Sequence, residues 1–445
     1  MLLLASCSLH AAPIYVDNQS NCAGLTVCYT TIQEAVNNAV ADDQIRVFPG
    51  VYPELVDISL MGSAIGPGID GNIGFITVDV SNAAVPGTAQ VSPATGSGFT
   101  HTGATFDGDV MVDGFVLIST DDDGIDLDLV NGDIVVRNVT ASGNFSDGID
   151  LEVADGGHTI AVHDSIANNN GSSGLNLDGP DATVVIVSNV LGNENVGEGI
   201  IVNSVADDDE LSVSIFDSGT LDNGTVMATS AGVAVITAGV LDVRNLNSSL
   251  NRGPGLVVFG LGETSIADSN FDGNGLIDDF DGILFRAAGT IAINRSAAKD
   301  NGSAGIWASA PAFGMAELTE LNIECSSFSG NKFGVVLRPS LSTTASYSLH
   351  QSNLTGQSVA GIHAGVAVAS IDATNNWWGS TTGPTHSLNA AGDGDHVSDV
   401  DDDVVGDAQG TVNYLPFSSS ATSIAQYPSD ALFVAGFEGN ACTLL

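Results

Sequence analysis

The sequence predicts an all-β protein, a single-stranded right-handed parallel β-helix (solenoid) with a short N-terminal capping helix. A unit of glycine followed by alternating apolar residues recurs along the middle of the 445-residue chain. Glycine is abundant at 53 residues while proline is scarce at 13, and hydrophobic residues make up 43% although aromatic ones make up only 6%. Such a composition indicates frequent turns, short strands and a core of small aliphatic side chains, which favours stacked coils.

The repeats occupy residues 111–373. Each unit has a small or polar residue, then a glycine, and then apolar residues one and three positions after the glycine. Because side chains alternate along a strand, these apolar residues are expected to point into the coil. The glycines lie 23 to 33 residues apart, at Gly124, Gly148, Gly174, Gly199, Gly232, Gly255, Gly282, Gly305, Gly334 and Gly361. Asparagines at equivalent corners are predicted to form amide ladders between coils. A single coil cannot bury its own apolar edge, so the units must stack. A β-propeller would show longer blades and another period.

Residues 13–110 are predicted to form the N-terminal cap and the first coils. The apolar residues Ile32, Ala35, Val36, Ala39 and Val40 fall on one face of a helix. Thr31 and Glu34 make a capping box at its start. An amphipathic helix at this place would cover the open end of the coils, which otherwise exposes a sheet edge.

Residues 1–12 predict an export signal, because an apolar start is followed by small residues. Leu4-Ala5-Ser6-Cys7 is similar to a bacterial lipobox, which would place a lipid anchor on Cys7; cleavage near Ala12 is the alternative. No stretch elsewhere is apolar enough to span a bilayer. Export to an oxidising compartment agrees with a local disulfide between Cys22 and Cys28, whereas Cys325 is predicted to be an inert thiol in the core.

Residues 374–420 are predicted to close the β-helix, and residues 421–445 form a tail. The tryptophans of Asn375-Asn376-Trp377-Trp378-Gly379 either close the last coil or stack on sugars, and the closing role is favoured. The acidic stretch 393–407 is a candidate cation-binding loop, although it lacks the residue order of an EF-hand loop. Residues 433–440 resemble a short C-terminal tag of some exported proteins.

The repeats, the capping segment at 31–52 and the closing segment with Asn375-Asn376-Trp377-Trp378-Gly379 together resemble bacterial right-handed parallel β-helix proteins of the pectate-lyase-like fold, of an extracellular type. Related lyases use Arg or Lys as a base beside an acidic calcium site. Here Arg137 is predicted on a different strand from the acidic residues, and Arg286 and Arg295 lie far along the axis. The Gly-His-Gly and Arg-Ile-Lys motifs of polygalacturonase-like members do not occur. The resemblance therefore implies the fold and leaves the activity open.

The charge of the chain limits its partners. Nine Lys and Arg residues stand against 53 Asp and Glu residues, for a formal net charge of −44. Such a surface repels phosphate backbones, which excludes nucleic acid as a partner. It also repels anionic membranes and polyanionic glycans unless cations intervene.

Acidic residues follow the glycine at the same two outward positions of consecutive repeats: Asp126 and Asp128, Asp150 and Glu152, and then Asn176 and Asp178. Because neighbouring coils stack about 4.8 Å apart, two short ladders are expected, Asp126–Asp150–Asn176 and Asp128–Glu152–Asp178. Further aspartates precede them at the corner, namely Asp121, Asp122, Asp123 and Asp147. Like charges at this spacing must be solvated, be partly protonated or share a cation.

Three interpretations of these carboxylates follow. The first is a solvated acidic face. The second is a calcium site with Asp126, Asp128, Asp150, Glu152 and Asp178 as ligands, since hard oxygen ligands suit this ion. The third is a catalytic carboxylate pair for glycan cleavage, drawn from Asp123, Asp126, Asp147 and Asp150. No other cofactor is predicted.

Two functional hypotheses result. The first is a non-catalytic exported protein of a bacterium, secreted or associated with the cell surface, outer membrane or surrounding matrix, that interacts with polysaccharide or surface components. The alternative is a polysaccharide-degrading enzyme, a glycoside hydrolase or lyase, that uses the carboxylates on the β-helix face. Missing catalytic signatures favour the first hypothesis.

Overall fold

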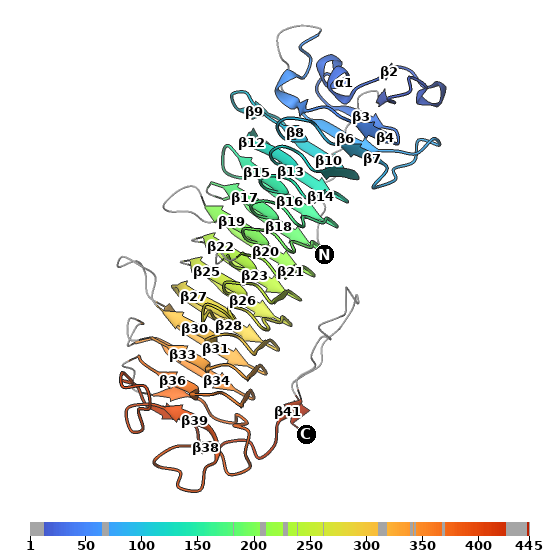
Figure 1. The fold of residues 1–445 in the computed structure, drawn as a ribbon. Helices are drawn as coiled ribbons and strands as arrows, with labels where there is room; N and C mark the ends of the chain where they lie inside the picture. Colours follow the sequence, from blue (N-terminus) through green and yellow to red (C-terminus); the bar gives the residue numbers. More distant parts are fainter. Residues whose placement is uncertain are drawn as a thin grey trace. The chain divides into compact units, whose positions relative to one another are not determined.

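Figure 1 shows a computed structural model of the protein, a nearly all-β parallel β-solenoid of about 12 turns with very little helix, which confirms the predicted fold class. The chain divides into two units, unit 1 at residues 1–212 and unit 2 at residues 213–445. The structure describes residues 13–64, 71–180, 182–204, 211–225, 230–237, 239–260, 262–309, 318–338, 341, 344–366, 370–423 and 443–444. The predicted export signal at 1–12, with Cys7, and the segment 433–440 lie outside these ranges.

Unit 1 is built from three sheets whose neighbouring strands belong to successive coils. The first sheet has the order β2 (Cys28–Tyr29), β1 (Ile14–Val16), β3 (Asp43–Val47), β6 (Ile73–Thr77), β10 (Val110–Asp113), β13 (Ile134–Arg137), β16 (Thr159–His163) and β18 (Val184–Ser188). The second contains β4 (Gly50–Tyr52), β7 (Ala89–Val91), β11 (Phe115–Ile118) and β14 (Thr140–Ser142). The third contains β5 (Val56–Asp57), β8 (Phe99–Thr100), β12 (Ile125–Asn131), β15 (Ile149–Val153), β17 (Leu175–Gly179) and β19 (Ile200–Ser204), with β9 (Phe106–Asp107) beside β12.

The predicted N-terminal helix is present as α1 (Ile32–Asn38). The Thr31 hydroxyl accepts a hydrogen bond from the backbone N–H of Glu34 at 3.1 Å, as the capping box requires. The helix ends before the predicted residues Ala39 and Val40, because Ala39 is already extended, with φ −72° and ψ 153°. A cap from outside the helix was not apparent in the sequence: both carboxylate oxygens of Glu54 accept hydrogen bonds from the first helical N–H groups, those of Ile32 and Gln33.

Asparagine ladders join the coils, as predicted. In unit 1 the side-chain oxygen of Asn170 accepts hydrogen bonds from both the backbone and the side-chain nitrogen of Asn144, each at 3.1 Å. Asn195 makes the same pair of contacts with Asn170. A ladder of the same kind occurs within unit 2, in the buried residues Asn223, Asn251, Asn274, Asn301 and Asn331. Each buried amide is thereby satisfied by its neighbour on the next coil.

Unit 2 repeats the architecture. Its first sheet has the order β20 (Ser212–Phe216), β23 (Val240–Arg244), β26 (Thr264–Ala267), β28 (Gly289–Asn294), β31 (Leu318–Glu324), β34 (Ser346–His350), β37 (Ile371–Asp372) and β40 (Val412–Asn413). A second long sheet contains β22 (Val233–Thr237), β25 (Leu256–Gly260), β27 (Ile283–Ala287), β30 (Ala304–Ser309), β33 (Phe333–Leu337), β36 (Ala360–Ala364), β39 (Gly394–Ser398) and β38 (Pro384–Thr385). Short strands complete the coils: β21 (Gly219–Leu221), β24 (Asn247–Ser249), β29 (Ala297–Lys299), β32 (Ser327–Ser329) and β35 (Asn353–Thr355), followed by the antiparallel pair β41 (Thr422–Ser423) and β42 (Thr443–Leu444).

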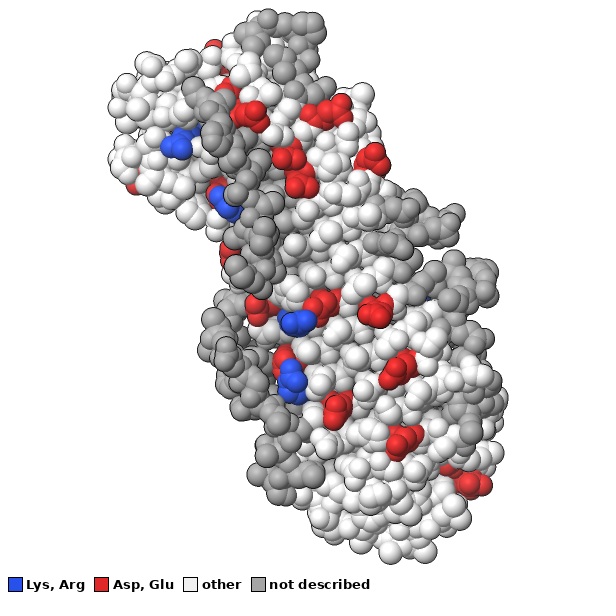
Figure 2. Space-filling view, turned by 180° about the vertical axis from the view of Figure 1, so that it is seen from behind, with Lys and Arg blue, Asp and Glu red and all other residues white. Residues whose placement is uncertain are grey.

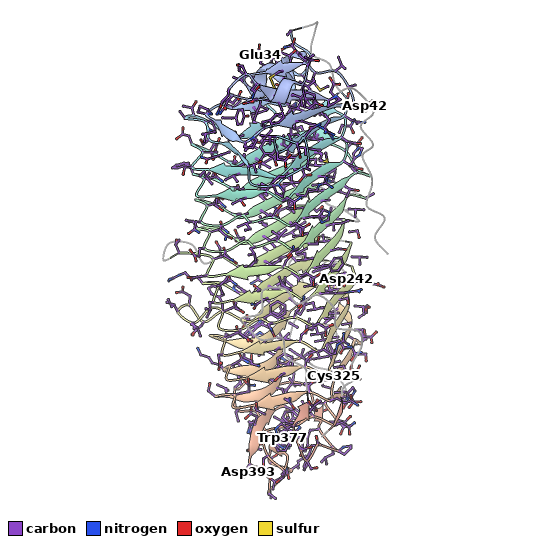
Figure 3. The ribbon with its side chains drawn as sticks, turned by 90° about the vertical axis from the view of Figure 1, so that its right-hand side faces the viewer. Glu34, Asp42, Asp242, Cys325, Trp377 and Asp393 are labelled. Atoms are coloured by element: carbon purple, nitrogen blue, oxygen red, sulfur yellow. A yellow bond between two sulfur atoms is a disulfide. The ribbon has the colours of Figure 1, made fainter. Side chains whose placement is uncertain are left out.

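The tryptophan pair lies beside the last coils of unit 2, where Figure 3 labels Trp377. Trp378 is fully buried, and its ring packs so closely on Gly361 that a Cβ there would lie 3.1 Å from it. Trp377 pairs with Asn353 through a β-bridge and is half-buried. The burial of Trp378 favours the closing role over a sugar-stacking role for this residue.

Cys22 and Cys28 form the predicted disulfide, with their Cα atoms 5.9 Å apart. Cys325 is also disulfide-bonded, so the prediction of an inert thiol was wrong. The sequence could not reveal this pairing, because its spacing in the chain carries no signal of its distance in the fold. No helix in the described part of the chain is long and apolar enough to cross a membrane.

Candidate functional site

The candidate site is the acidic face of unit 1, defined as Asp126, Asp128, Asp150, Glu152 and Asp178. These side chains stand on the outer side of β12, β15 and β17, because the residues between them (Ile125 and Leu127 on β12, for example) are fully buried in the core. The alternation of side chains along a strand therefore places every carboxylate on the solvent side. Figure 2 shows how few Lys and Arg side chains accompany the acidic ones on the surface seen there.

The strand register confirms the first predicted ladder. Asp126 lies opposite Asp150, and Asp150 lies opposite Asn176. Glu152 and Asp178 are also opposite one another. The pairing of Asp128 with Glu152 departs from the prediction, because the register shifts between Leu127 and Val130.

The shift arises from a bulge in β12. Leu129 takes a φ of 56°, which is rare for a branched apolar residue, and it adds one residue to this strand relative to β15. Bulges redirect side chains next to them. As a result Asp128 is electrostatically close to Asp150 and Asp178 as well as to Glu152.

Neutral donors hold the carboxylates in place. The Asp126 carboxylate accepts from the hydroxyls of Thr100 at 3.2 Å and Ser97 at 3.4 Å. The Asn176 amide donates to Asp150 at 3.0 Å and to Asp178 at 3.5 Å. Within the described residues, no Lys or Arg forms an ion pair with the acidic face.

Sequence reasoning missed Ser97 and Thr100, although a signal was present. Ser97-Gly98-Phe99-Thr100 is a further copy of the repeat in which phenylalanine replaces the aliphatic residue. β8 pairs with β12 so that Thr100 lies opposite Asp126.

Burial and mutual repulsion raise the pKa values across this face. The pKa of Asp150 rises to about 8, first because the carboxyl is desolvated and then because Asp128, Asp147, Asp123 and Asp178 repel its charge. Desolvation is also the main cause of the raised pKa values of Asp126, Asp128, Glu152 and Asp178. Asp150 therefore holds its proton at neutral pH beside other carboxyl groups.

Asp123 and Asp147, the other two catalytic candidates, lie at the corner that precedes these strands and are 7% and 8% exposed. The Asp123 carboxylate accepts a hydrogen bond from the backbone N–H of Asp147 at 2.6 Å, and Asp147 accepts from the backbone N–H of Ser173. Asp281 in unit 2 makes the same contact with the N–H of Ala304 at 2.8 Å. Burial raises the pKa of Asp123 to about 7 and that of Asp281 to about 6. These corner aspartates thus tie one coil to the next.

Among the described residues, no three His, Cys, Asp or Glu side chains converge as a group that could hold a metal ion. The acidic stretch 393–407 is likewise occupied with backbone contacts. Asp395 accepts from the N–H groups of Gly356 and Gln357, Asp399 from that of Val412, and Asp403 from those of Gly406 and Ala408.

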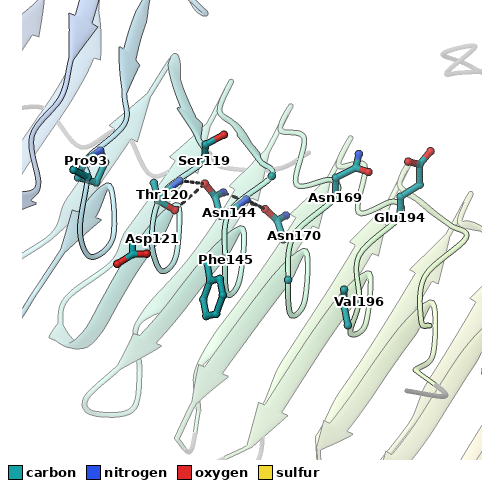
Figure 4. Close-up of a pocket in the computed structure, with 13 residues that line it drawn as sticks. Pro93, Ser119, Thr120, Asp121, Asn144, Phe145, Asn169, Asn170, Glu194 and Val196 are labelled. Atoms are coloured by element: carbon teal, nitrogen blue, oxygen red, sulfur yellow. Dashed lines mark hydrogen bonds between the residues drawn. The ribbon is translucent and has the colours of Figure 1, made fainter. Parts of the chain in front are cut away.

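A groove of about 800 Å³ runs along the corner next to the acidic face. We call it the corner groove; its lining side chains include Asp121, Phe145, Asn169, Glu194 and Val196 (Figure 4). Its floor contains the start of the amide ladder, where Asn144 accepts from the Thr120 hydroxyl at 2.8 Å. Sequence analysis did not predict this groove, because its walls come from separate coils.

Comparisons with known proteins do not assign the chain to a family. No family model matches the chain, and no curated protein matches it. Five solved structures match. Two are A-modules of the mannuronan C-5 epimerases AlgE4 and AlgE6 of Azotobacter vinelandii, at 15% and 14% identity and TM-scores of 0.48 and 0.47; the matches cover 78% and 68% of this chain and 96% and 90% of theirs. A third is pectate lyase Pel9A, at 13% identity, a TM-score of 0.35 and 80% coverage of both chains. At these values the similarity identifies neither a family nor an activity.

Proposed function

We propose that this protein is an exported β-helix protein that binds a polysaccharide on the acidic face of unit 1 without cleaving it. One observation carries the proposal: Asp126, Asp150 and Asn176 stand side by side on three consecutive coils, each partly exposed. A chain of sugars presents hydroxyl groups at regular intervals, and a row of carboxyl and amide groups at a regular spacing can accept and donate hydrogen bonds along it.

The charge of the face restricts the ligand. Since no Lys or Arg within the described residues pairs with these carboxylates, a polyanionic glycan would be repelled. The ligand is therefore a polysaccharide that is not itself a polyanion, or one bridged by calcium. Calcium binding by Asp126, Asp128, Asp150, Glu152 and Asp178 stays a prediction, and it requires these side chains to turn toward one another.

The location outside the cytoplasm belongs to the same proposal. The disulfide between Cys22 and Cys28 and the disulfide of Cys325 are typical of an oxidising compartment. We also propose that residues 1–12 are an export signal and that Cys7 carries a lipid. The proposal further includes membership of the extracellular bacterial type that has the Trp377-Trp378 segment.

A second candidate function, glycan cleavage, is favoured by the raised pKa of Asp150. A carboxyl that keeps its proton up to about pH 8 can act as a general acid, and Asp126 on the adjacent coil is the nearest candidate for its partner carboxylate. Retaining glycosidases need two carboxyl groups about 5 to 5.5 Å apart, which is close to the spacing of neighbouring coils.

A glycan array coupled to an assay for reducing or unsaturated ends separates the two functions, with and without calcium. We expect the wild type to retain glycans without forming products. The double variant Asp126→Asn/Asp150→Asn should lose most of this retention, whereas Asp242→Asn in unit 2 should keep it. If the wild type forms products at an enzyme-like rate and the double variant does not, the function is glycan cleavage and not binding alone. Unchanged retention in the double variant would refute the acidic face as the site.

A further inference from the structure

We infer that the corner groove of unit 1 binds a polysaccharide that carries free amines, with Phe145 beneath a sugar ring and Asp121 and Glu194 beside its ammonium groups. This inference rests on the proposed function and narrows its ligand. The groove is about 800 Å³ of open space lined by the turns of consecutive coils, and all of its lining residues belong to unit 1.

The apolar part of the groove is unusual for this surface. Phe145 is 76% exposed, although the other large aromatic side chains of these coils, such as Phe99 and Phe115, are fully buried. Val196 stands on the same side of the groove at 39% exposure (Figure 4). An exposed phenylalanine ring offers an apolar face for stacking and attracts cations through its π electrons.

The charged side chains of the groove favour a ligand with positive charge. Asp121 and Glu194 are both exposed and line the groove on coils that lie apart along the axis, and none of the described residues that line it is Lys, Arg or His. Asp121 points to the same side of the turns as Phe145, whereas Glu194 points to the opposite side (Figure 4). A ligand that lies across the turns would therefore meet a carboxylate on either side, with the phenylalanine ring beside Asp121. A polyanion would be repelled here as it is at the acidic face.

The backbone of the groove favours a glycan over a peptide. The N–H groups along it are already used between coils: Phe145 donates to Thr120 at 3.2 Å, Gly171 to Asn144 at 2.9 Å, and Val196 to Asn170 at 3.0 Å. A bound peptide would find no strand edge here for its own N–H and C=O groups. A sugar chain needs only an aromatic face and separate polar side chains, which the groove supplies.

Binding of three probes tests the inference by calorimetry at a mildly acidic pH at which the amines are charged. The probes are a glucosamine oligomer, its fully N-acetylated counterpart, and a lysine peptide of equal charge. We expect the glucosamine oligomer to bind about tenfold more tightly than either of the others, with an affinity that falls as salt is added. Equal binding of the N-acetylated oligomer would remove the role of the amines, and equal binding of the lysine peptide would overturn the glycan assignment.

Groove variants locate the site. Phe145→Ala should weaken binding of the glucosamine oligomer about fivefold, and Asp121→Asn/Glu194→Gln should abolish the preference for amines. Matched controls lie in unit 2: Ile277→Ala removes an apolar side chain that is 73% exposed, and Asp222→Asn/Glu263→Gln makes the same change of charge at exposed positions. If the groove variants bind like these controls, the inference fails. If only Asp126→Asn/Asp150→Asn loses binding, the proposed function stands while the groove is excluded, and if no glycan binds, both fail.

Discussion

Replacing Asp150 by asparagine is expected to stabilise the protein in mildly alkaline solution and to change its stability little in acid. Burial and four neighbouring aspartates raise the pKa of this carboxyl from 3.8 to about 8. The folded state therefore binds the proton more tightly than the unfolded state does. Below pH 3.8 the carboxyl is protonated in both the folded and the unfolded state, so it does not lower the stability of the fold. As the pH rises from 3.8 to about 8, the unfolded state loses this proton while the folded state keeps it, and the free energy of unfolding falls progressively.

The size of the effect follows from the shift. At about 1.36 kcal/mol per pH unit, a rise from 3.8 to about 8 corresponds to an upper limit of about 6 kcal/mol in the free energy of unfolding. Asp150 is partly exposed, and its surroundings can rearrange or bind cations, so we expect Asp150→Asn to add about 2 kcal/mol in alkaline solution. Asparagine keeps the oxygen that accepts the hydrogen bond from Asn176, so the ladder is preserved.

Urea unfolding of the wild type and of Asp150→Asn across this pH range measures the effect. The two curves of unfolding free energy against pH should meet in acid and diverge as the pH rises. Asp155→Asn, an exposed change on the same coil, serves as the control and should shift stability by no more than about 0.5 kcal/mol at any pH. Destabilisation by Asp150→Asn in alkaline solution, or equal stabilisation at every pH, would refute this account of the acidic face.

The amide ladder, the closing segment and the acidic face each give a further prediction. Asn170→Ala should lower the free energy of unfolding by about 3 kcal/mol in urea titrations, because it leaves buried groups of Asn144 and Ala141 without partners; a loss below about 0.5 kcal/mol would show that the ladder is dispensable. Trp378→Ala should cost about 3 to 5 kcal/mol by opening a cavity in unit 2, while glycan retention by unit 1 persists, and a selective loss of retention with unchanged stability would instead make Trp378 part of a binding site. If calcium binds the acidic face, millimolar calcium should raise the melting temperature of the wild type but not of Asp126→Asn/Asp150→Asn; identical melts in calcium and in chelator would count against this site.

The repeat pattern predicted the fold because its information is local. The glycine at each corner and the apolar residues that follow it recur in each copy, and an asparagine precedes the glycine in most copies, so these residues determine a coil before any coil is placed on another. The same pattern predicted that Asp126, Asp150 and Asn176 would stand in line. The capping box at Thr31 is local in the same way.

The details of the site depend on neighbours that are distant in sequence. The bulge at Leu129 breaks the second ladder at its first step, and nothing in the repeat pattern marks it. Asp123 and Asp147 look like surface carboxylates in the sequence, yet each accepts a backbone N–H from the following coil.

By itself, the sequence of this protein determined a stack of parallel coils, their inward and outward faces, the amide ladders and an acid-rich surface, because each follows from spacing within a repeat. Only the tertiary structure decided the desolvation that raises the pKa of Asp150, the exposure of Phe145 and the space of the corner groove. The physical reason is that desolvation, exposure and open volume belong to the assembled surface. They depend on which side chains of separate coils come together, and the spacing within one repeat carries no information about that.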